Sequence, residues 1–190
     1  MRTNNLIPLY EPNIGNEELK AVERVLKSRV LSRGNQIEYF EKEFADFVGK
    51  KYAIAVNSGT SALHLIVRSM GWGKGDEVIT TPFSFIASGN ALLYENVKPV
   101  FSDIDPISLN LDPANVKNKI THKTKGILLV NIFGLPAYED IFHDIRKQYG
   151  ISIVEDSCEA LGEISSRFKV GLLGDVSAYG FFSNKQITTG

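Results

Sequence analysis

The sequence is poor in cysteine and has no excess of charge of either sign. Cys158 is the single cysteine among 190 residues, which excludes a disulfide within the chain. Lys and Arg together number 21 and Asp and Glu 22, so the net charge is −1. This balance favours neither nucleic acid nor an anionic membrane over a small-molecule ligand.

Long apolar runs, internal repeats and low-complexity tracts are also missing. The first residues, Met1–Asn5, lead into no hydrophobic stretch of the length of a signal peptide or a membrane span. We therefore expect a cytoplasmic protein without membrane contact. With 43% hydrophobic and 23% charged residues, the chain has the composition of a folded domain with a substantial core.

The spacing of apolar residues predicts two amphipathic helices near the N-terminus. From Glu17 to Lys27 they recur at helical intervals, behind Asn16 as the expected N-cap. The second helix begins near Ile37 and ends at Gly49, a residue type that commonly terminates helices. We therefore predict that residues 1–50 form a helical N-terminal arm.

After residue 51, short apolar runs alternate with longer helical stretches. This pattern is typical of an α/β fold with a mostly parallel sheet flanked by crossover helices, and we predict such a domain over residues 51–190. The predicted strands are Ala53–Val56, Glu77–Thr80, Pro99–Ser102, Ile127–Asn131, Ser152–Glu155 and Ser177–Gly180, and the predicted helices are Ser61–Met70, Ser84–Tyr94, Pro113–Ile120 and Tyr138–Tyr149.

The segment Asn57–Ala62 lies where a predicted strand gives way to a predicted helix. Such a turn directs free backbone N–H groups and the positive end of the helix dipole toward an anion, for which phosphate is suitable. The same small residues also form an ordinary capped turn, so both interpretations remain open. The segment matches neither the dinucleotide fingerprint nor the P-loop.

Two further residues fall where open α/β sheets bind ligands, at or beyond the carboxyl ends of predicted strands. Asp156 follows one strand, and an Asp there can hold a pyridine nitrogen in its cationic form, unless it only caps a helix. Lys185 lies 185 − 156 = 29 residues further on, where a desolvated amine can form a Schiff base with an aldehyde. A solvated surface lysine is the alternative.

Four other side chains have weaker claims to chemistry. Phe85 can lie flat on a cofactor ring, although aromatic residues near helix starts more often belong to the core. Cys158 has no histidine placed to activate it and is predicted to be a buried, inert thiol. Asp103 and Asp105 are predicted to form a turn, and no metal site is expected.

Taken together and in order, these segments resemble the DegT/DnrJ/StrS family of pyridoxal-phosphate (PLP)-dependent aminotransferases, which act on nucleotide-linked keto-sugars. The combination is far more specific than any one segment, and it runs from about Pro8 to Gly190. The segments that carry the resemblance are Ser28–Gly34, Asn57–Leu63, Val154–Asp156 with Ala160–Gly162, and Asn184–Gly190.

The resemblance implies an aspartate-aminotransferase-like (fold type I) large domain that binds PLP. It further implies that Lys185 forms the Schiff base with the cofactor, that Asp156 pairs with the ring nitrogen, and that Phe85 stacks on the ring. The expected parent protein is a homodimer, because enzymes of this kind place the active site at a dimer interface.

The resemblance assigns the remaining cofactor contacts to three residues. Gly59 and Thr60 are expected to bind the phosphate, and Glu159 is expected beside the oxygen of the ring. The implied reaction is the transfer of an amino group, usually from glutamate, to a ketone of a nucleotide-linked sugar. Such sugars serve polysaccharide, lipopolysaccharide or antibiotic synthesis.

The sequence departs from the family in three respects. Gly180 stands where many relatives have a serine that contacts the phosphate, so we expect weaker phosphate binding. Asn131 stands where many have a histidine, so substrate preference is expected to differ. The chain is also shorter than family members, and we expect the small C-terminal domain to be absent.

Three other interpretations remain. A PLP-dependent sugar dehydratase shares the fold but replaces the lysine by histidine, and Lys185 argues against it. A fragment that binds PLP without catalysis is distinguished only by an activity assay. A Rossmann-type nucleotide-binding module requires a glycine-rich dinucleotide turn, which the sequence lacks.

Overall fold

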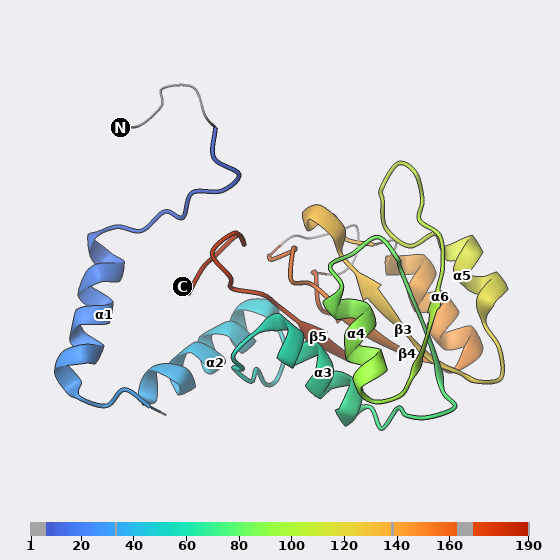
Figure 1. Ribbon diagram of the computed structural model, residues 1–190, viewed down its shortest axis with the longest axis horizontal. Helices are drawn as coiled ribbons and strands as arrows, with labels where there is room; N and C mark the ends of the chain where they lie inside the picture. Colours follow the sequence, from blue (N-terminus) through green and yellow to red (C-terminus); the bar gives the residue numbers. More distant parts are fainter. Residues whose placement is uncertain (1–6, 33, 138, 163–168, 190) are drawn as a thin grey trace.

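The computed structural model describes residues 7–32, 34–137, 139–162 and 169–189; Arg33, Tyr138 and Gly190, which belong to predicted segments, lie outside this part of the chain. A parallel sheet with the strand order β2-β1-β3-β4-β5 forms its centre (Figure 1). The strands are β1 (Glu77–Thr80), β2 (Lys98–Phe101), β3 (Thr124–Val130), β4 (Ser152–Asp156) and β5 (Val176–Ala178). The predicted parallel sheet is confirmed.

Helices cover both faces of this sheet. Leucine, isoleucine and valine side chains of α3 and α4 pack on one face, and those of α5 and α6 pack on the other. Among the described helices, none is both long and apolar enough to cross a membrane. The helices are α1 (Asn16–Ser28), α2 (Asn35–Val48), α3 (Gly59–Ser69), α4 (Ala87–Tyr94), α5 (Pro113–Lys119) and α6 (Glu139–Tyr149), with a short 3-10 turn, η1 (Ile132–Gly134).

Successive side chains of a strand point to opposite faces, and this alternation decides where the functional groups lie. On β4, Ile153 belongs to the core beneath α5 and α6, whereas Val154 belongs to the core beneath α3 and α4. Asp156, two residues beyond Val154, therefore points to the side of α3 and α4. Glu155 points to the opposite side.

One glycine of the sheet permits a close approach of a large side chain. A Cβ atom at Gly126 in β3 would lie 2.6 Å from the ring of Trp72 and 2.8 Å from the carbonyl oxygen of Ser152. Since real Cβ atoms do not approach other atoms so closely, only glycine allows Trp72 to pack over β3. The buried indole then fills the end of the core under α3 and α4.

The two N-terminal helices differ in how they contact the rest of the protein. Figure 1 shows α1 apart from the sheet, and none of its residues is buried. In α2, Phe44 packs edge-on against Tyr179 and Phe181, with ring centroids 5.0 and 5.3 Å apart. The apolar face of this predicted amphipathic helix thus covers the segment that follows β5.

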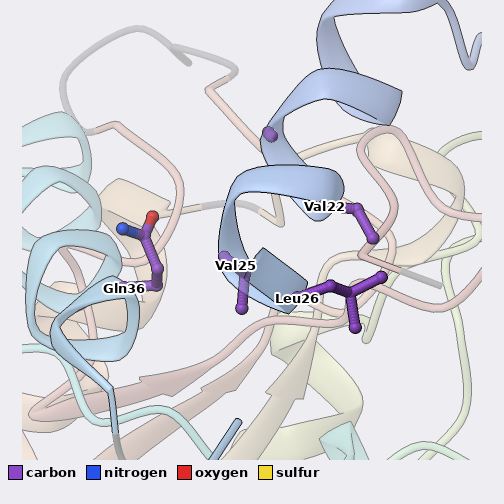
Figure 2. A pocket seen from close by; sticks show the side chains of 5 residues that line it. Val22, Val25, Leu26 and Gln36 are labelled. Carbon is purple, nitrogen blue, oxygen red and sulfur yellow. The ribbon is translucent and has the colours of Figure 1, made fainter. Parts of the chain in front are cut away.

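Between α1 and α2 lies an apolar groove of about 270 Å³, shown in Figure 2. Val22, Val25 and Leu26 of α1 line it together with Ala21, and Gln36 is the single polar residue among its lining side chains. Of the residues that the structure describes, no charged one lines the groove, so these side chains offer nothing for acid–base or anion chemistry. Side chains suited to such chemistry lie instead at the edge of the sheet.

Two predictions about local structure are wrong. Residues 53–56 form no strand: Ile54 is 81% exposed, and the amide of Ala55 donates to the side chain of Glu41 at 2.7 Å. The apolar pattern of this segment is that of a strand. Among the described residues, however, no strand lies beside it to form the hydrogen bonds of a sheet. Asn16 is the first residue of α1, and Gly15 is the N-cap, whose amide donates to Glu18 Oε2.

Other boundaries agree closely. The helix predicted from Ser84 begins at Ala87, because residues 81–86 form an irregular turn after β1. Asp112 caps α5 as expected, accepting a hydrogen bond from the amide of Ala114 at 2.8 Å. Gly49 ends α2 with a left-handed φ of 78°, which glycine adopts at little cost.

A pair of leucines in α3 tests the assignment of its buried face. Leu63 is 1% exposed and Leu65 is 51% exposed. Leu63→Ala should lower the free energy of unfolding by about 2–5 kcal/mol, since it leaves a cavity in the core. The matched variant Leu65→Ala should lower it by about 0.5 kcal/mol. Urea denaturation measures both, and equal losses would contradict the orientation of α3.

Candidate active site

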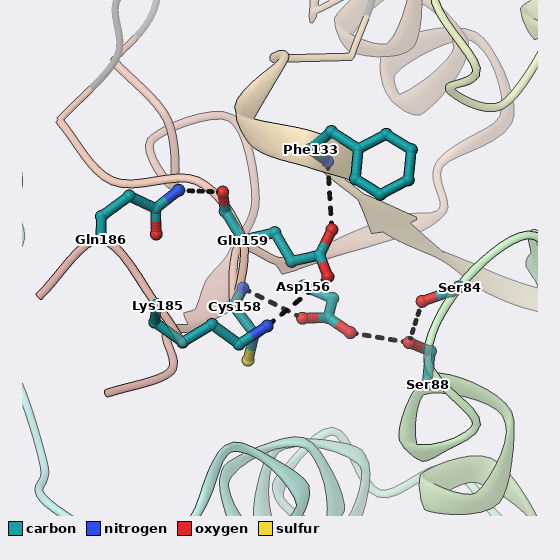
Figure 3. A network of polar contacts seen from close by, with 8 residues as sticks. All are labelled: Ser84, Ser88, Phe133, Asp156, Cys158, Glu159, Lys185 and Gln186. Carbon is teal, nitrogen blue, oxygen red and sulfur yellow. Dashed lines mark hydrogen bonds and ion pairs between the residues drawn. The ribbon is translucent and has the colours of Figure 1, made fainter. Parts of the chain in front are cut away.

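The carboxyl ends of four strands bring chemically useful side chains to one edge of the sheet. Asp156 ends β4, Phe133 follows β3, Lys185 follows β5, and two serines follow β1. Figure 3 shows these side chains together with Cys158, Glu159 and Gln186. Because all five strands are parallel, their carboxyl ends lie at the same edge, where open α/β sheets bind ligands.

Asp156 is fixed by hydrogen bonds to both of its carboxylate oxygens. Ser88 Oγ of α4 donates to Oδ2 at 2.7 Å, and the amide of Cys158 donates to Oδ1 at 3.2 Å (Figure 3). The residue is 6% exposed. It is therefore a buried, oriented acceptor at the sheet edge, as a partner for a protonated ring nitrogen requires.

Lys185 and Glu159 form an ion pair on the neighbouring segments, with Nζ 3.5 Å from Oε1. The other oxygen of Glu159 accepts a hydrogen bond from the amide of Phe133 at 3.1 Å, and Gln186 Nε2 donates to the Glu159 carbonyl. Glu159 thus joins three segments around the Lys185 amine.

A pocket of about 410 Å³ opens beside this ion pair. Its lining is mostly polar, with one exposed aromatic ring at Phe133, whose φ of 51° is unusual for a residue other than glycine. The side chain of Lys185 is 20% exposed, so the amine is accessible from the pocket. The lining residues are Phe133, Glu159, Asn184, Lys185 and Gln186.

The predicted phosphate turn lies at the start of α3, next to the same site. Ser58 is the N-cap: its side chain accepts from the amide of Ser61 at 3.1 Å, and its carbonyl accepts from the amide of Ala62 at 3.0 Å. The amides of Gly59 and Thr60 precede the bonds within the helix and are directed out of its N-terminus. Phosphate binding by these two amides stays a prediction, since free N–H groups at a helix N-terminus suit an anion.

Gly59 also shows how closely this turn approaches the segment after β4. A Cβ atom at Gly59 would lie 2.8 Å from Cys158 Sγ, so the α3 N-terminus packs directly on Cys158. Cys158 in turn donates its amide to Asp156. The structure therefore brings Gly59, Asp156, Glu159 and Lys185 into one region.

The side chain of Phe85 has no described contact with the other predicted cofactor residues, although its carbonyl accepts from the amide of Ser88 at 3.2 Å. It lies in the turn before α4 and is 72% exposed. Its neighbour Phe83 packs edge-on against Phe133, with ring centroids 5.9 Å apart. Stacking of Phe85 on a ring remains a prediction.

The segment that carries Lys185 is held by local and distant contacts. The amide of Lys185 donates to the carbonyl of Phe182 at 2.9 Å, and that of Thr189 donates to Phe181 at 3.0 Å. The ring of Phe181 packs on Phe40 and Phe44 of α2. Helix α2 thus supports the loop that carries the Lys185 amine.

Glu155 is fully buried in a cage of donors on the other side of β4. The amides of Gly171 and Gly174 donate to its oxygens at 3.0 and 2.6 Å, and Asn131 Nδ2 donates at 3.1 Å. Nearby, Lys50 Nζ donates to the Gly174 carbonyl at 2.7 Å; burial lowers the pKa of Lys50, while the charge of Glu155 opposes that shift. The cage fastens the chain before β5 to β4.

Asn131, one of the departures from the family, is completely buried within this network. Its amide also donates to Ser157 Oγ at 3.0 Å, and its oxygen accepts from the amide of Ala137 at 3.0 Å. The side chain therefore fixes the turn that presents Phe133. Any influence on substrate preference has to act through that turn.

Gly180, the other departure, lies against Cys158. A Cβ atom there would be 3.2 Å from Cys158 Cβ and 3.3 Å from the Cys158 carbonyl oxygen. A serine would require a local shift of the chain, so glycine suits the packing around Cys158. This crowding is a physical reason for the departure.

Cys158 is predicted to be a buried, inert thiol, and the residue is half-buried. Desolvation of the thiol raises its pKa far above the ordinary range, and the negative charge of Asp156 raises it further. Since the thiolate is the nucleophilic form, inertness at neutral pH stays a prediction that this shift supports.

The sequence reasoning missed the serines and the aromatic ring near the site. Ser84 and Ser88 lie in the same segment as Phe85, the residue predicted there as a cofactor contact. Their four-residue spacing after a strand places both hydroxyls on one side of a helix start. No sequence pattern indicates that Phe133 lies at the site, because its left-handed backbone conformation depends on contacts that form only in the folded chain.

Comparison with known proteins identifies the family of this chain. The model of the DegT/DnrJ/EryC1/StrS aminotransferase family matches residues 12–190, which is most of the chain. The chain belongs to this family. The resemblance inferred from the sequence segments is confirmed, and the matching region contains Gly59, Asp156, Glu159 and Lys185.

Individual relatives are similar over the whole chain. The spore coat polysaccharide biosynthesis protein SpsC of Bacillus subtilis is 38% identical over 189 residues, covering 100% of this chain and 49% of that protein. The GDP-perosamine synthase of Vibrio cholerae is 40% identical over 186 residues, or 97% of this chain and 51% of that protein. The chain therefore spans about half the length of these relatives.

Solved structures have the same fold. PseC of Helicobacter pylori, described as an aminotransferase in the biosynthesis of pseudoaminic acid, superimposes with a TM-score of 0.92 at 33% identity, covering 97% of this chain and 50% of that one. A GDP-4-keto-6-deoxy-D-mannose-3-dehydratase of E. coli with bound hydrated PLP gives 0.93 at 30% identity, covering 96% and 49%. The predicted fold type I sheet is thus confirmed, and relatives of this fold differ in reaction.

The donor cage of Glu155 predicts a specific loss of stability. Glu155→Gln is nearly isosteric but directs an amide donor at backbone donors, so it should lower the free energy of unfolding by about 1–3 kcal/mol. Urea denaturation measures the loss. Glu38→Gln, at an exposed position of α2, is the matched control and should have little effect.

The raised pKa of Cys158 predicts slow thiol chemistry. At pH 8 the folded chain should react with a disulfide reagent such as DTNB much more slowly than free cysteine, and the reaction should become complete in urea. Absorbance of the released thiolate measures both rates. Equal rates in the folded and unfolded chain would contradict the burial of this thiol.

Proposed function

We propose that this chain is the cofactor-binding part of a PLP-dependent aminotransferase. The full protein would transfer an amino group, with glutamate as donor, to a keto group of a nucleotide-linked sugar in the cytoplasm. The observation that carries the proposal is the convergence of the Lys185 amine, the oriented Asp156 carboxylate and the α3 N-terminus at one sheet edge. Each matches one part of PLP.

The chemistry of these groups fits the cofactor. The amides of Gly59 and Thr60 suit its phosphate, because a helix N-terminus favours an anion. Asp156 suits a protonated pyridine nitrogen, since it is a buried acceptor with both oxygens already oriented. Glu159, beside the Lys185 amine, suits the polar edge of the ring. Phe85 is proposed to cover the ring face.

When bound, PLP would supply an electron sink for the substrate's Cα. Lys185 would hold the cofactor and would carry the proton at Cα. Asp156 would accept the hydrogen bond of the ring N–H and so keep the ring nitrogen protonated. Before the cofactor binds, Glu159 would hold the Lys185 amine at the pocket, because the two side chains form an ion pair.

The substrate class rests on the relatives. Proteins named for GDP-perosamine synthesis, for pseudoaminic acid biosynthesis and for spore coat polysaccharide biosynthesis all match this chain. We therefore propose a nucleotide-linked sugar of a polysaccharide or cell-surface pathway as the acceptor. We further propose that residues 1–50 act as an arm, that residues 51–190 form the PLP-binding domain, and that the full protein is a homodimer.

A second candidate function is sugar dehydration. The similarity to the E. coli dehydratase favours it. That branch of the family is expected to carry histidine at the position of the cofactor lysine, whereas this chain has Lys185. We therefore place the aminotransferase first, and the fate of the substrate's amino group distinguishes the two reactions.

Covalent trapping tests the cofactor site. The purified chain is mixed with PLP, its visible spectrum is recorded, and borohydride reduction is followed by mass spectrometry of the peptides. We expect one stable adduct, on Lys185, that is missing in Lys185→Ala. Lys74→Ala removes an exposed turn lysine and is the matched control, in which the adduct should persist.

The outcomes separate an aminotransferase from a fragment that only binds PLP. An adduct on Lys185 followed by amino transfer from glutamate to the cofactor supports the aminotransferase. An adduct without such transfer supports a fragment that only binds PLP. A folded chain that forms no adduct, or forms adducts equally on Lys74 and Lys185, contradicts the proposed site.

A further inference from the structure

Ser84, in the turn before α4, and Ser88, in α4, form a chain of hydrogen bonds that ends at Asp156. We infer that Ser88 is a positioning residue that, together with Ser84, orients the Asp156 carboxylate toward the cofactor ring. This inference rests on the proposed PLP site and deepens it. No cofactor contact is assigned to either serine, since both act through Asp156.

The contact joins distant parts of the chain inside the core. Ser88 Oγ lies 2.7 Å from Asp156 Oδ2, and Ser84 Oγ lies 2.9 Å from Ser88 Oγ (Figure 3). Ser88 is 1% exposed, so water does not compete for its hydroxyl. A buried hydroxyl that spans 68 residues of sequence to a buried carboxylate is a specific interaction rather than a local cap.

The direction of the hydrogen bonds follows from the chemistry of the groups. An ionised carboxylate only accepts, so the proton of Ser88 is directed to Asp156. The oxygen of Ser88 is then left as an acceptor, and Ser84 must donate to it. The result is an ordered chain from half-buried Ser84 through Ser88 to Asp156, and hydrogen bonds to a charged group are stronger than neutral ones.

Two segments therefore hold the carboxylate from two sides. The amide of Cys158 binds Oδ1 from the segment after β4, and Ser88 binds Oδ2 from α4. Rotation of the carboxylate about its side chain breaks both bonds. If Ser88 is lost, one oxygen is unsatisfied in a buried place, and the orientation is held from one side only.

The consequence concerns the ring nitrogen of the cofactor. A carboxylate held in one orientation can accept a proton from the ring without first reorganising. Loss of the Ser88 hydroxyl should weaken PLP binding and should favour loss of the ring proton as pH rises. In the described part of the chain, Asp156, Glu159 and Lys185 all act on Cys158, and the substitution changes none of these titratable groups.

The test compares variants of the serine chain in the whole protein. Ser88→Ala removes the hydroxyl, Ser88→Thr keeps it, and Ser84→Ala shortens the chain at its outer end. Ser69→Ala is the matched control, because Ser69 donates to the carbonyl of Ile66 within α3, away from Asp156. The dissociation constant of PLP is measured from the visible absorbance, and the spectrum of the bound cofactor is recorded between pH 6 and about 9.

We expect PLP to bind about 10-fold more weakly to Ser88→Ala, with the pH-dependent change of its spectrum displaced to lower pH. Ser88→Thr should bind within about two-fold of the parent, and Ser84→Ala should show a smaller loss in the same direction. Ser69→Ala should match the parent. A purely structural role for Ser88 would lower the unfolding midpoint without displacing the spectral change.

Two results overturn the inference. The first is parental PLP affinity and an unchanged spectral titration in folded Ser88→Ala. The second applies if Ser88→Ala does not fold: parental behaviour of Ser84→Ala then contradicts the ordered chain. Both are distinct from failure of the proposed function, in which the parent chain itself forms no adduct on Lys185.

Discussion

Two consecutive acidic residues at the end of β4 face opposite sides of the sheet, and the site depends on this alternation. Glu155 turns into the donor cage of the 171–174 segment, which secures the chain leading into β5. Asp156 turns toward α4, where Ser88 meets it. One strand end therefore fixes both the oriented carboxylate and, through β5, the loop that carries Lys185.

The hydrogen bonds to Asp156 and those to Glu155 meet the same physical requirement. A buried carboxylate is stable only when its oxygens are satisfied, so each acidic side chain needs its own set of donors. For Glu155 the donors are backbone amides and Asn131, which make a rigid scaffold. For Asp156 they include the Ser88 hydroxyl and the Cys158 amide, which orient the carboxylate.

Much of the fold could be predicted from the sequence, since strands such as β3 and helices such as α2 have strong apolar patterns. The extended segment 53–56 could not, because a strand needs a neighbour and the pattern does not reveal whether one is present. Asp156 and Lys185 could be proposed from their positions after strands. Ser88 could not, because only the packing of α4 on the sheet shows which hydroxyl reaches Asp156.

In the proposed site, Asp156 and Lys185 serve one cofactor. The decisive measurement is nitrogen NMR of PLP that is labelled at the ring nitrogen and bound to the chain. We predict a protonated ring nitrogen in the parent chain and loss of this proton in Asp156→Asn, with the cofactor still attached to Lys185. An unchanged, protonated nitrogen in Asp156→Asn would contradict it.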